Sequence, residues 1–344
     1  MRNKPRISIW SLLSKYGLGL ISGILQLAAN EKIRLTLQKW RLLGLANWIY
    51  GKLTHAVARL PQIDAPIYFL GERLFAEREW ISRMVDGEGT YEVKANAVSK
   101  SSWKTPICAV LVSLYKSDSY LDSFLENIQS QTIIDKCEVV IISVLPSEFE
   151  KITLEVFAEK NKYVNLIFTD VRIGIYEAWN RAITYSSAKY ITNMNADDVR
   201  HPLSLEIQVS ELEQDELIDV VYQDVYYTLR QNLAFDTIAR VGMKSNLPQV
   251  STQILARGIN APHNAPMWRR SLHDRIGLFD ETFLSAGDHD FWIRASIEGA
   301  TFKKSAEVHV SYFINPEGMS TKKNSPGASE GIRILDKYRQ HAQG

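Results

Sequence analysis

The chain has 344 residues, which is enough for two domains. Its apolar and charged fractions, 45% and 23%, are those of an ordinary globular protein and exclude a disordered chain. A net charge of +1 gives the whole molecule no general attraction to nucleic acid. The two cysteines, Cys108 and Cys137, lack the spacing of metal ligands, so we expect buried free thiols in a reducing compartment.

The first sixty residues are strongly basic, with ten Lys and Arg residues and one acid, Glu31. Residues 7–29 are the most apolar stretch, but Lys15 interrupts it, so it is at best a marginal membrane-spanning helix. The same lysine argues against a signal peptide, as does the absence of later features typical of secreted proteins.

Residues 31–60 contain no proline and are predicted to be helical. We expect this segment to lie on an anionic membrane surface, with its basic side chains above an apolar face. A small helical domain packed against the rest of the protein remains the alternative. Four basic residues fall on one narrow helical stripe: Arg34, Arg41, Lys52 and Arg59.

From residue 107 onward, apolar strands alternate with helices, which predicts an α/β domain with a doubly wound, mostly parallel sheet. We divide the chain into a helical, basic N-terminal region with a linker (1–100), the α/β domain (101–325) and a C-terminal helix or tail (326–344). Strands are expected at residues 107–114, 139–145, 164–169 and 189–193, and helices at 120–131, 152–161 and 175–186.

Two adjacent carboxylates, Asp197 and Asp198, follow a predicted buried strand in the stretch 189–202, K-Y-I-T-N-M-N-A-D-D-V-R-H-P. Ligands of open α/β sheets bind at the ends of strands. Carboxylate oxygens suit Mg2+ or Mn2+, which also bridge to substrate phosphates. The stretch therefore indicates a metal-phosphate site; the alternative is that one of these acids caps a helix that begins near Pro202.

Three motifs in this order resemble the family 2 glycosyltransferases, whose fold is GT-A. Residues 174–183, G-I-Y-E-A-W-N-R-A-I, are similar to the family's Gly-x-x-x-Ala-x-Asn helix, and residues 195–198, N-A-D-D, to its Asp-Ala-Asp-Asp run. Residues 276–294 resemble the acceptor-side block, in which an acid before a Trp-x-x-Arg helix acts as base. The resemblance covers roughly two-thirds of the chain, residues 106–320.

The resemblance implies a chemistry that these residue types can perform. A divalent ion neutralises the charge that develops on a departing diphosphate, and one carboxylate deprotonates the attacking hydroxyl. By position Asp197 is the metal ligand and Asp288 the base, an arrangement that fits a one-step, inverting displacement. Asn195 replaces the family's first Asp and brings no charge to the metal, and Gly287 stands where many relatives carry Glu. Asp288 could instead cap the helix that follows it.

The resemblance also implies donor and acceptor contacts. Residues 143–147 replace the Asp-Asp-Gly-Ser run with which relatives read the nucleotide base, so the nucleotide stays unassigned. The donor contacts implied are Ser113, Tyr115, Arg172, Gly174, Asn180, Asn195 and Asp198, and the acceptor-side residues are His263, Arg270 and Asp290.

We therefore expect a metal-dependent, inverting glycosyltransferase that uses Mg2+ or Mn2+. It would move a sugar from a nucleotide-sugar donor to a glycan or lipid-linked saccharide in surface polysaccharide synthesis, in the cytoplasm and peripherally on the inner face of the membrane. A catalytically inactive nucleotide- or glycan-binding protein of the same fold is one alternative, motivated by Asn195 and Ser143. The basic first sixty residues suggest a nucleic-acid-binding protein as another, but we expect no nucleic-acid partner because the remainder is neutral and carries no recognisable nucleic-acid-reading module.

Overall fold

The computed structural model describes residues 105–342, with gaps at 242–243, 316–317 and 320–324. The N-terminal region predicted for residues 1–100, and with it the membrane contact, lies outside the described residues. None of the helices in the described part of the chain has the length and apolar content needed to cross a bilayer.

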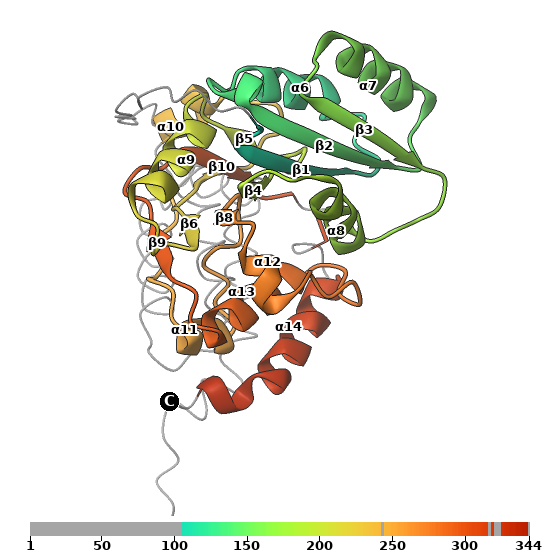
Figure 1. Cartoon of the computed structure of the whole chain (residues 1–344). Helices are drawn as coiled ribbons and strands as arrows, with labels where there is room; N and C mark the ends of the chain where they lie inside the picture. The colour runs from blue at the N-terminus through green and yellow to red at the C-terminus, as the bar shows by residue number, and fades with distance from the viewer. Residues whose placement is uncertain (1–104, 242–243, 316–317, 320–324, 343–344) are drawn as a thin grey trace, which may run out of the picture. The chain divides into compact units, whose positions relative to one another are not determined.

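A seven-stranded sheet forms the centre of the described domain, in the order β3-β2-β1-β4-β8-β6-β9 (Figure 1). The first four strands run parallel, β8 is antiparallel to both β4 and β6, and β9 is parallel to β6. The predicted doubly wound, mostly parallel α/β sheet is confirmed. The strands are β1 Cys108–Leu114, β2 Cys137–Val144, β3 Val164–Thr169, β4 Tyr190–Asn193, β6 Val220–Tyr222, β8 Met267–Arg269 and β9 Phe302–Lys304.

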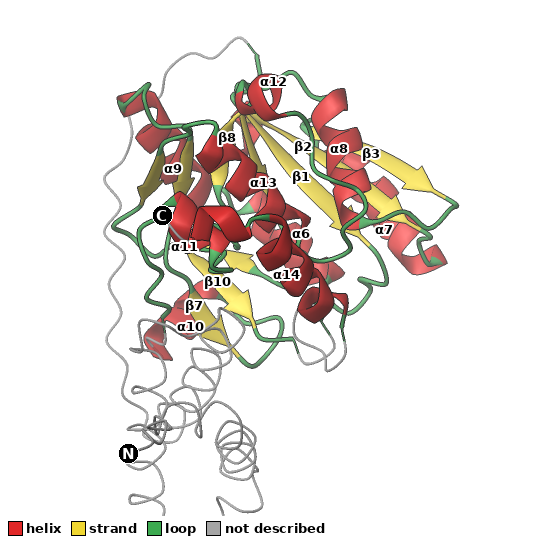
Figure 2. Cartoon of the chain, turned by 90° about the horizontal axis from the view of Figure 1, so that it is seen from below, coloured by secondary structure: helices red, strands yellow, loops and turns green. Residues whose placement is uncertain are grey.

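A second, three-stranded sheet has the order β5-β10-β7. In Figure 2 β7 and β10 lie beside the helix α10. Because β5 begins directly after Asp198, this sheet starts at the carboxylate pair that the sequence singles out. The bounds are β5 Val199–Arg200, β7 Tyr226–Thr228, β10 Val310–Phe313 and α10 Phe235–Val241.

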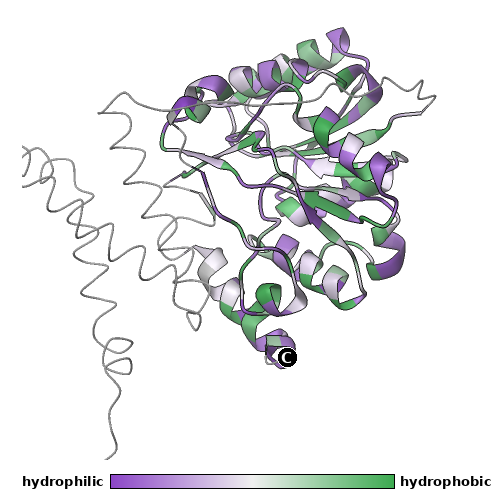
Figure 3. Cartoon of the chain, turned by 90° about the vertical axis from the view of Figure 1, so that its left-hand side faces the viewer, coloured by the Kyte–Doolittle hydropathy of each residue, from purple (hydrophilic) through white to green (hydrophobic). Residues whose placement is uncertain are grey.

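Alternate residues of the central strands face opposite sides of the large sheet, so each side has its own hydrophobic core. Along β1, Ala109 and Leu111 pack on one side, whereas Val110 and Val112 pack on the other. Figure 3 shows hydrophobic and hydrophilic residues mixed along the helices, as expected where one helix face covers a core. The helices of the first side are α8 Ile175–Tyr185, α12 Leu272–Ile276, α13 Gly287–Ile297 and α14 Pro326–Lys337; those of the second are α6 Leu121–Gln129, α7 Glu148–Lys160 and α9 Ser204–Gln214. Shorter elements are α11 Thr252–Ala256 and the 3-10 turns η2 Ile134–Lys136 and η3 Arg339–Ala342.

Two consecutive arginines at the end of β8 hold helices on both sides of the sheet. Arg269 donates to the carbonyls of Leu212 and Asp215 at the end of α9, at 2.6 and 3.0 Å. Arg270 donates to the carbonyls of Ile183 and Ser186 at the end of α8. Guanidinium groups thus satisfy carbonyls that have no partner inside a helix and complement the helix dipole.

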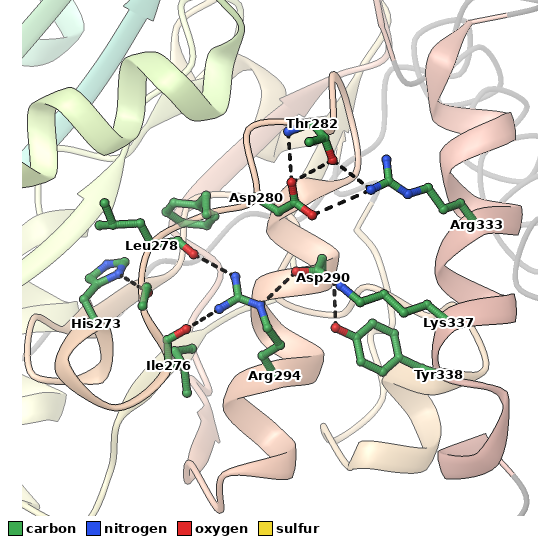
Figure 4. A network of polar contacts seen from close by, with 12 residues as sticks. His273, Ile276, Leu278, Asp280, Thr282, Asp290, Arg294, Arg333, Lys337 and Tyr338 are labelled. Carbon is green, nitrogen blue, oxygen red and sulfur yellow. Dashed lines mark hydrogen bonds and ion pairs between the residues drawn. The ribbon is translucent and has the colours of Figure 1, made fainter.

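The helix α14 belongs to the same domain as the sheet. Ile334 is fully buried in the core formed by α8 and α13, and Tyr338 lies beside it. Around the buried Asp290 of α13, Lys337 and Tyr338 bind one carboxylate oxygen at 2.6 and 2.8 Å (Figure 4). α14 thus packs on the core of the α/β domain, and the boundary expected at residue 325 stays a prediction.

Candidate active site

The acidic turn between β4 and β5 carries two carboxylates. Asp197 is partly exposed, whereas Asp198 is buried and hydrogen-bonded within the protein. Asp198 is 7% exposed; its Oδ1 accepts from the backbone N–H of Phe313 at 3.0 Å and its Oδ2 from the Asn195 amide at 2.9 Å. Asp197 is partly exposed, and its Oδ2 accepts from Asn315 at 3.3 Å. Asp198 therefore shapes the turn, and its role as a donor contact stays a prediction, as does that of Asp197 as the metal ligand.

The contact between Asn195 and Asp198 explains why an amide stands where the family has an acid. The Asn195 Nδ2 donates to Asp198 at 2.9 Å, and its Oδ1 accepts from Asn193 at 3.3 Å. An aspartate at position 195 would place two carboxylates in direct contact in a largely desolvated turn, where both cannot be ionised. The amide therefore stabilises this arrangement of the turn, and the role of Asn195 as a donor contact stays a prediction.

Burial governs the ionisation of the acidic turn. Burial raises the pKa of Asp198 well above its usual range, and the nearby Asp197 carboxylate raises it further. Burial also raises the pKa of Asp197, against the effect of the hydrogen bond from Asn315. A divalent cation at this place would favour the ionised carboxylates, since an opposite charge lowers a carboxyl pKa.

Arg200, on β5, is a buried cation behind this turn that the sequence analysis missed. Its Nη2 donates to the Thr192 hydroxyl at 2.5 Å and to the carbonyls of Asn193 and Ala265 at 2.9 and 3.3 Å. Burial lowers the pKa of this arginine to about 10. The guanidinium joins the end of β4 to the loop before β8 and fixes where the acidic turn begins.

The donor set at this turn fits a hard divalent ion that shares a phosphate with the protein. Within the described ranges, no three His, Cys, Asp or Glu side chains gather into a cage that would hold a metal ion by itself. Mg2+ is usually bound by one or two carboxylates together with substrate phosphates and waters. One partly exposed carboxylate, Asp197, matches that pattern, and it would hold the ion jointly with a diphosphate.

Asp288 lies in the first turn of α13, and two neutral groups orient it. Its Oδ1 is 2.9 Å from the Tyr176 hydroxyl, and its Oδ2 accepts from the Asn260 amide at 2.8 Å. The side chain remains partly exposed. Burial raises the pKa of Asp288, whereas the hydrogen bonds from Asn260 and Tyr176 lower it. The carboxylate is thus held in a fixed orientation and made more basic than a carboxylate in water.

The structure explains the glycine at position 287, where many relatives carry Glu. A Cβ on Gly287 would lie 2.7 Å from Cδ2 and Cε2 of the Tyr176 ring, closer than real Cβ contacts. Tyr176 therefore occupies the space that a side chain at 287 would need. The sequence contained one signal for this residue, because Tyr176 lies within the helix motif that begins at Gly174.

The loop before β8 connects the surroundings of the two carboxylates. Asn260 donates to Asp288, the carbonyl of Ala265 accepts from Arg200, and the carbonyl of Pro266 accepts from Thr192 of β4 at 2.6 Å. The chain from residue 260 to residue 265 spans about 18 Å or less. This loop therefore reaches from the candidate base to the strand that leads into the acidic turn.

The candidate donor contacts at the ends of β1 and β3 include a stacked pair. The guanidinium carbon of Arg172 lies 3.6 Å from the centre of the Tyr115 ring, and both side chains are exposed. Ser113 is partly buried near the end of β1. Gly174 is the N-cap of α8, and a Cβ there would meet nothing within 4 Å. An open helix N-terminus beside an arginine can receive an anion.

Residues 143–147, at the end of β2, replace the acids with which relatives read the nucleotide base. The side chain of Ser143 is buried. The Ser143 hydroxyl donates to the fully buried Glu150 of α7 at 2.6 Å. Leu145, two residues later, has a φ of +51°, in the left-handed region. The serine side chain is therefore directed into the protein just before a tight turn of the backbone.

Three predicted site residues have partners within the protein, and their roles in binding stay predictions. The Asn180 amide donates to the carbonyl of Phe279 and accepts from its N–H at 2.9 and 3.0 Å, so it ties α8 to the loop before α13. Arg270 binds the end of α8. Asp290 is paired with Arg294 at 2.9 Å and Lys337 at 2.6 Å (Figure 4).

His263 lies between Asn260 and Ala265 in the loop before β8. Its ring packs edge-on against Tyr312 of β10, with ring centres 5.6 Å apart. Burial lowers the pKa of His263 to about 4, so the ring is neutral at neutral pH. A neutral imidazole can orient a hydroxyl but brings no charge to a phosphate.

Sequence comparisons find that the chain is similar to glycosyltransferases. The profile of Glycosyl transferase family 2 matches residues 109–275, a range that ends before Asp288. An uncharacterized glycosyltransferase of Methanocaldococcus jannaschii is 22% identical over 210 residues, which are 61% of this chain and 71% of that protein. One of Haemophilus influenzae is 26% identical over 251 residues, covering 63% and 77%. The hyaluronan synthase of Pasteurella multocida is 25% identical over 223 residues, covering 64% of this chain and 22% of the synthase.

Solved structures share the fold at low sequence identity. S. aureus TarS 1–349 in complex with UDP-GlcNAc superposes with a TM-score of 0.52 at 16% identity, covering 68% of this chain and 72% of that TarS fragment. The complex with UDP gives a TM-score of 0.50 at 16% identity, with 67% and 64% covered. These similarities confirm the GT-A type of α/β fold.

Proposed function

We propose, from the premise that the chain belongs to glycosyl transferase family 2, that it transfers a sugar with inversion. The donor is a nucleotide-sugar, and the acceptor is a hydroxyl of a glycan or lipid-linked saccharide. The single observation that carries this proposal is the environment of Asp288. A partly exposed carboxylate, oriented on both oxygens by neutral groups, stands at the start of α13 as a base would.

Asp288 removes the proton from the attacking hydroxyl. Its raised pKa, caused by burial, favours proton uptake. Asn260 and Tyr176 hold the carboxylate so that the lone pairs not used by them face the acceptor. A single base of this kind corresponds to a single displacement, because a double displacement of the glycosidase kind requires a nucleophile beside the base.

Asp197 would hold Mg2+ or Mn2+ together with the donor diphosphate. When bound, the ion neutralises the negative charge that develops on the leaving diphosphate. Asn315 orients Asp197 by donating to its Oδ2 at 3.3 Å, and Asp198 holds the turn to β10. The leaving group would then lie at the acidic turn and the acceptor at Asp288.

The donor's nucleotide occupies the ends of β1 to β3. Tyr115 and Arg172 supply a stacked, exposed aromatic and cationic surface for a base, and Gly174 opens the N-terminus of α8 to phosphate. The similarity to the hyaluronan and chondroitin synthases of Pasteurella multocida supports a role in surface polysaccharide synthesis. We place this reaction in the cytoplasm, on the inner face of the membrane.

Nucleotide binding and turnover, measured on the full chain, test the proposal. UDP, UDP-GlcNAc, GDP and GDP-mannose are screened by thermal shift with and without Mn2+, and release of free nucleoside diphosphate from the sugar donors is then followed. We expect a Mn2+-dependent shift with one nucleotide, and Asp288→Asn should reduce turnover at least 100-fold while the shift remains.

Asp274→Asn, on the exposed side of α12, is the matched control and should behave as the wild type. Binding without turnover by the wild type, with all donors and added saccharide acceptors, would identify the inactive nucleotide-binding protein instead. Equal turnover in wild type and Asp288→Asn would remove Asp288 from the mechanism.

A further inference from the structure

The Tyr176 hydroxyl stands between two acceptors and has one proton to give. It lies 2.8 Å from the carbonyl oxygen of Ser285 and 2.9 Å from Oδ1 of Asp288. A phenol donates to one acceptor at a time, while its oxygen can also accept. The direction of the Tyr176 O–H bond therefore depends on whether Asp288 carries a proton.

An ionised Asp288 is the stronger acceptor and takes the Tyr176 hydrogen bond, because charge-assisted hydrogen bonds are stronger than neutral ones. A protonated Asp288 can donate from Oδ1 to the tyrosine oxygen, and the phenolic proton then turns to the Ser285 carbonyl. Both states are fully hydrogen-bonded without any movement of heavy atoms. In the second state, the carbonyl of Ser285 accepts the hydrogen bond from the Tyr176 hydroxyl.

The ring that carries this hydroxyl is fixed, so that only the O–H bond can turn. Tyr176 is 3% exposed, and its ring centre lies 5.5 Å from that of Trp179 and 5.8 Å from that of Phe279. Its ring also covers Gly287, whose missing side chain leaves the space that the ring fills. This packing keeps the Tyr176 hydroxyl within hydrogen-bond distance of Asp288.

We propose that Tyr176 is a positioning residue for Asp288, and that its hydroxyl follows the proton during transfer. Before the reaction it donates to the carboxylate; afterwards it accepts from the carboxylic acid and donates to Ser285. This inference rests on the proposed function.

The step is balanced without any net change at tyrosine. The acceptor O–H bond breaks, and its proton forms the new O–H bond at Asp288. The acceptor oxygen forms the bond to the sugar carbon, and the bond from that carbon to the diphosphate breaks with its electron pair on the leaving group. Tyr176 keeps its own proton, and burial, followed by the nearby Asp288 charge, raises its pKa well above the usual value.

Other titratable groups near Asp288 are turned to different partners. On the same helix, the His289 ring is directed at the carbonyl of Leu255 at 2.9 Å, and Asp290 is paired with Arg294 and Lys337. From α14, Glu330 binds the backbone of residues 284–286. Among the described residues, Asp288 is thus hydrogen-bonded by one titratable side chain, Tyr176, and by the neutral Asn260.

The test compares Tyr176→Phe with Tyr185→Phe, an exposed tyrosine at the other end of α8 whose hydroxyl contacts Asn165. Because the Tyr176 hydrogen bond favours the ionised carboxylate, its loss should raise the Asp288 pKa. We expect the acidic limb of kcat/KM to move about 0.5–1 unit to higher pH. We expect kcat to fall about 10-fold with an unchanged KM for the donor. Tyr185→Phe should leave both quantities unchanged.

A second measurement does not depend on turnover. The Asp288 carboxyl is titrated by carbon-13 NMR, assigned with Asp288→Asn, in wild type and Tyr176→Phe. A higher pKa in Tyr176→Phe supports the inference even if the wild type transfers no sugar, in which case the proposed function alone falls. An unchanged carboxyl pKa overturns the inference, as does a loss of kcat matched by an equal rise in KM, which would indicate a merely structural tyrosine.

Discussion

Glu330 of α14 holds the backbone just before Asp288, and its removal is the most direct test of how the base is positioned. Its Oε1 accepts from the N–H of Leu284 at 2.6 Å, and its Oε2 from the N–H groups of Ser285 and Ala286 at 2.8 and 2.9 Å. The side chain is 8% exposed. Three backbone donors thus converge on one buried carboxylate, and the peptide that they fix includes the Ser285 carbonyl beside Tyr176.

The substitution Glu330→Gln keeps the shape but offers a single acceptor oxygen. Whichever way the amide turns, at least one backbone N–H faces an NH2 group, and the remaining bonds lose the help of the charge. Hydrogen bonds to charged groups contribute about 1.5–3 kcal/mol, and an unsatisfied buried donor costs about 1–3 kcal/mol. We therefore expect the free energy of unfolding to fall by about 2–4 kcal/mol.

Urea unfolding followed by circular dichroism measures this difference, and donor turnover is measured far below the unfolding midpoint. We expect turnover to fall at least 10-fold in folded Glu330→Gln, because the residues before Asp288 lose their anchor. Glu298→Gln, an exposed position after α13, is the control. A loss of less than about 0.5 kcal/mol, the usual range of surface substitutions, would refute the reasoning.

Three further substitutions test other contacts. Asn195→Asp should lower the free energy of unfolding by about 2–3 kcal/mol, because it places a second carboxylate against Asp198. Urea titrations at pH 8 without divalent ions measure this loss. An unchanged midpoint would contradict the proposed role of the Asn195 amide. Arg172→Ala should weaken binding of the preferred nucleoside diphosphate about 10-fold by calorimetry, by removing the cation over Tyr115. Equal affinity would place the nucleotide elsewhere. Asp290→Asn should lower the free energy of unfolding by about 3 kcal/mol at pH 7. Burial opposes ionisation of this group, but its hydrogen bonds from Lys337, Arg294 and Tyr338 outweigh burial and hold its pKa below the usual value. The Asp290 carboxylate therefore contributes its full stability above about pH 4, and this contribution is lost as the pH falls further. The urea unfolding curves of the wild type and Asp290→Asn should converge in acid.

The sequence was sufficient for the four parallel strands β1 to β4 and for the place of Asp197 after β4, but not for β6, β8, β9 or the second sheet. Apolar runs such as that of β1 have few alternatives to a buried parallel strand, and the polar turn after β4 can lie only at the edge of such a sheet. The expected burial of the free thiols of Cys108 and Cys137 is also confirmed. The assignment of Asp197 to metal and Asp288 to proton transfer remains a prediction.

The partners of polar residues could not be read from spacing. Asn180 and Arg270 lie within motifs, but their side chains meet backbone groups that are far away in sequence, and only the packed structure shows this. Tyr176 reaches Asp288 across 112 positions, and Asn260 reaches it from a loop of no recognisable pattern. Contacts of this kind depend on how helices pack and not on a local motif.

The paired arginines at the end of β8 have a mechanical consequence. Since Arg269 fastens α9 on one side and Arg270 fastens α8 on the other, neither layer can shear along the sheet without breaking charge-assisted bonds to helix carbonyls. Substrates of different size must therefore be accommodated by adjustments of the connecting segments, while the sheet and the helices on its two sides act as a rigid frame.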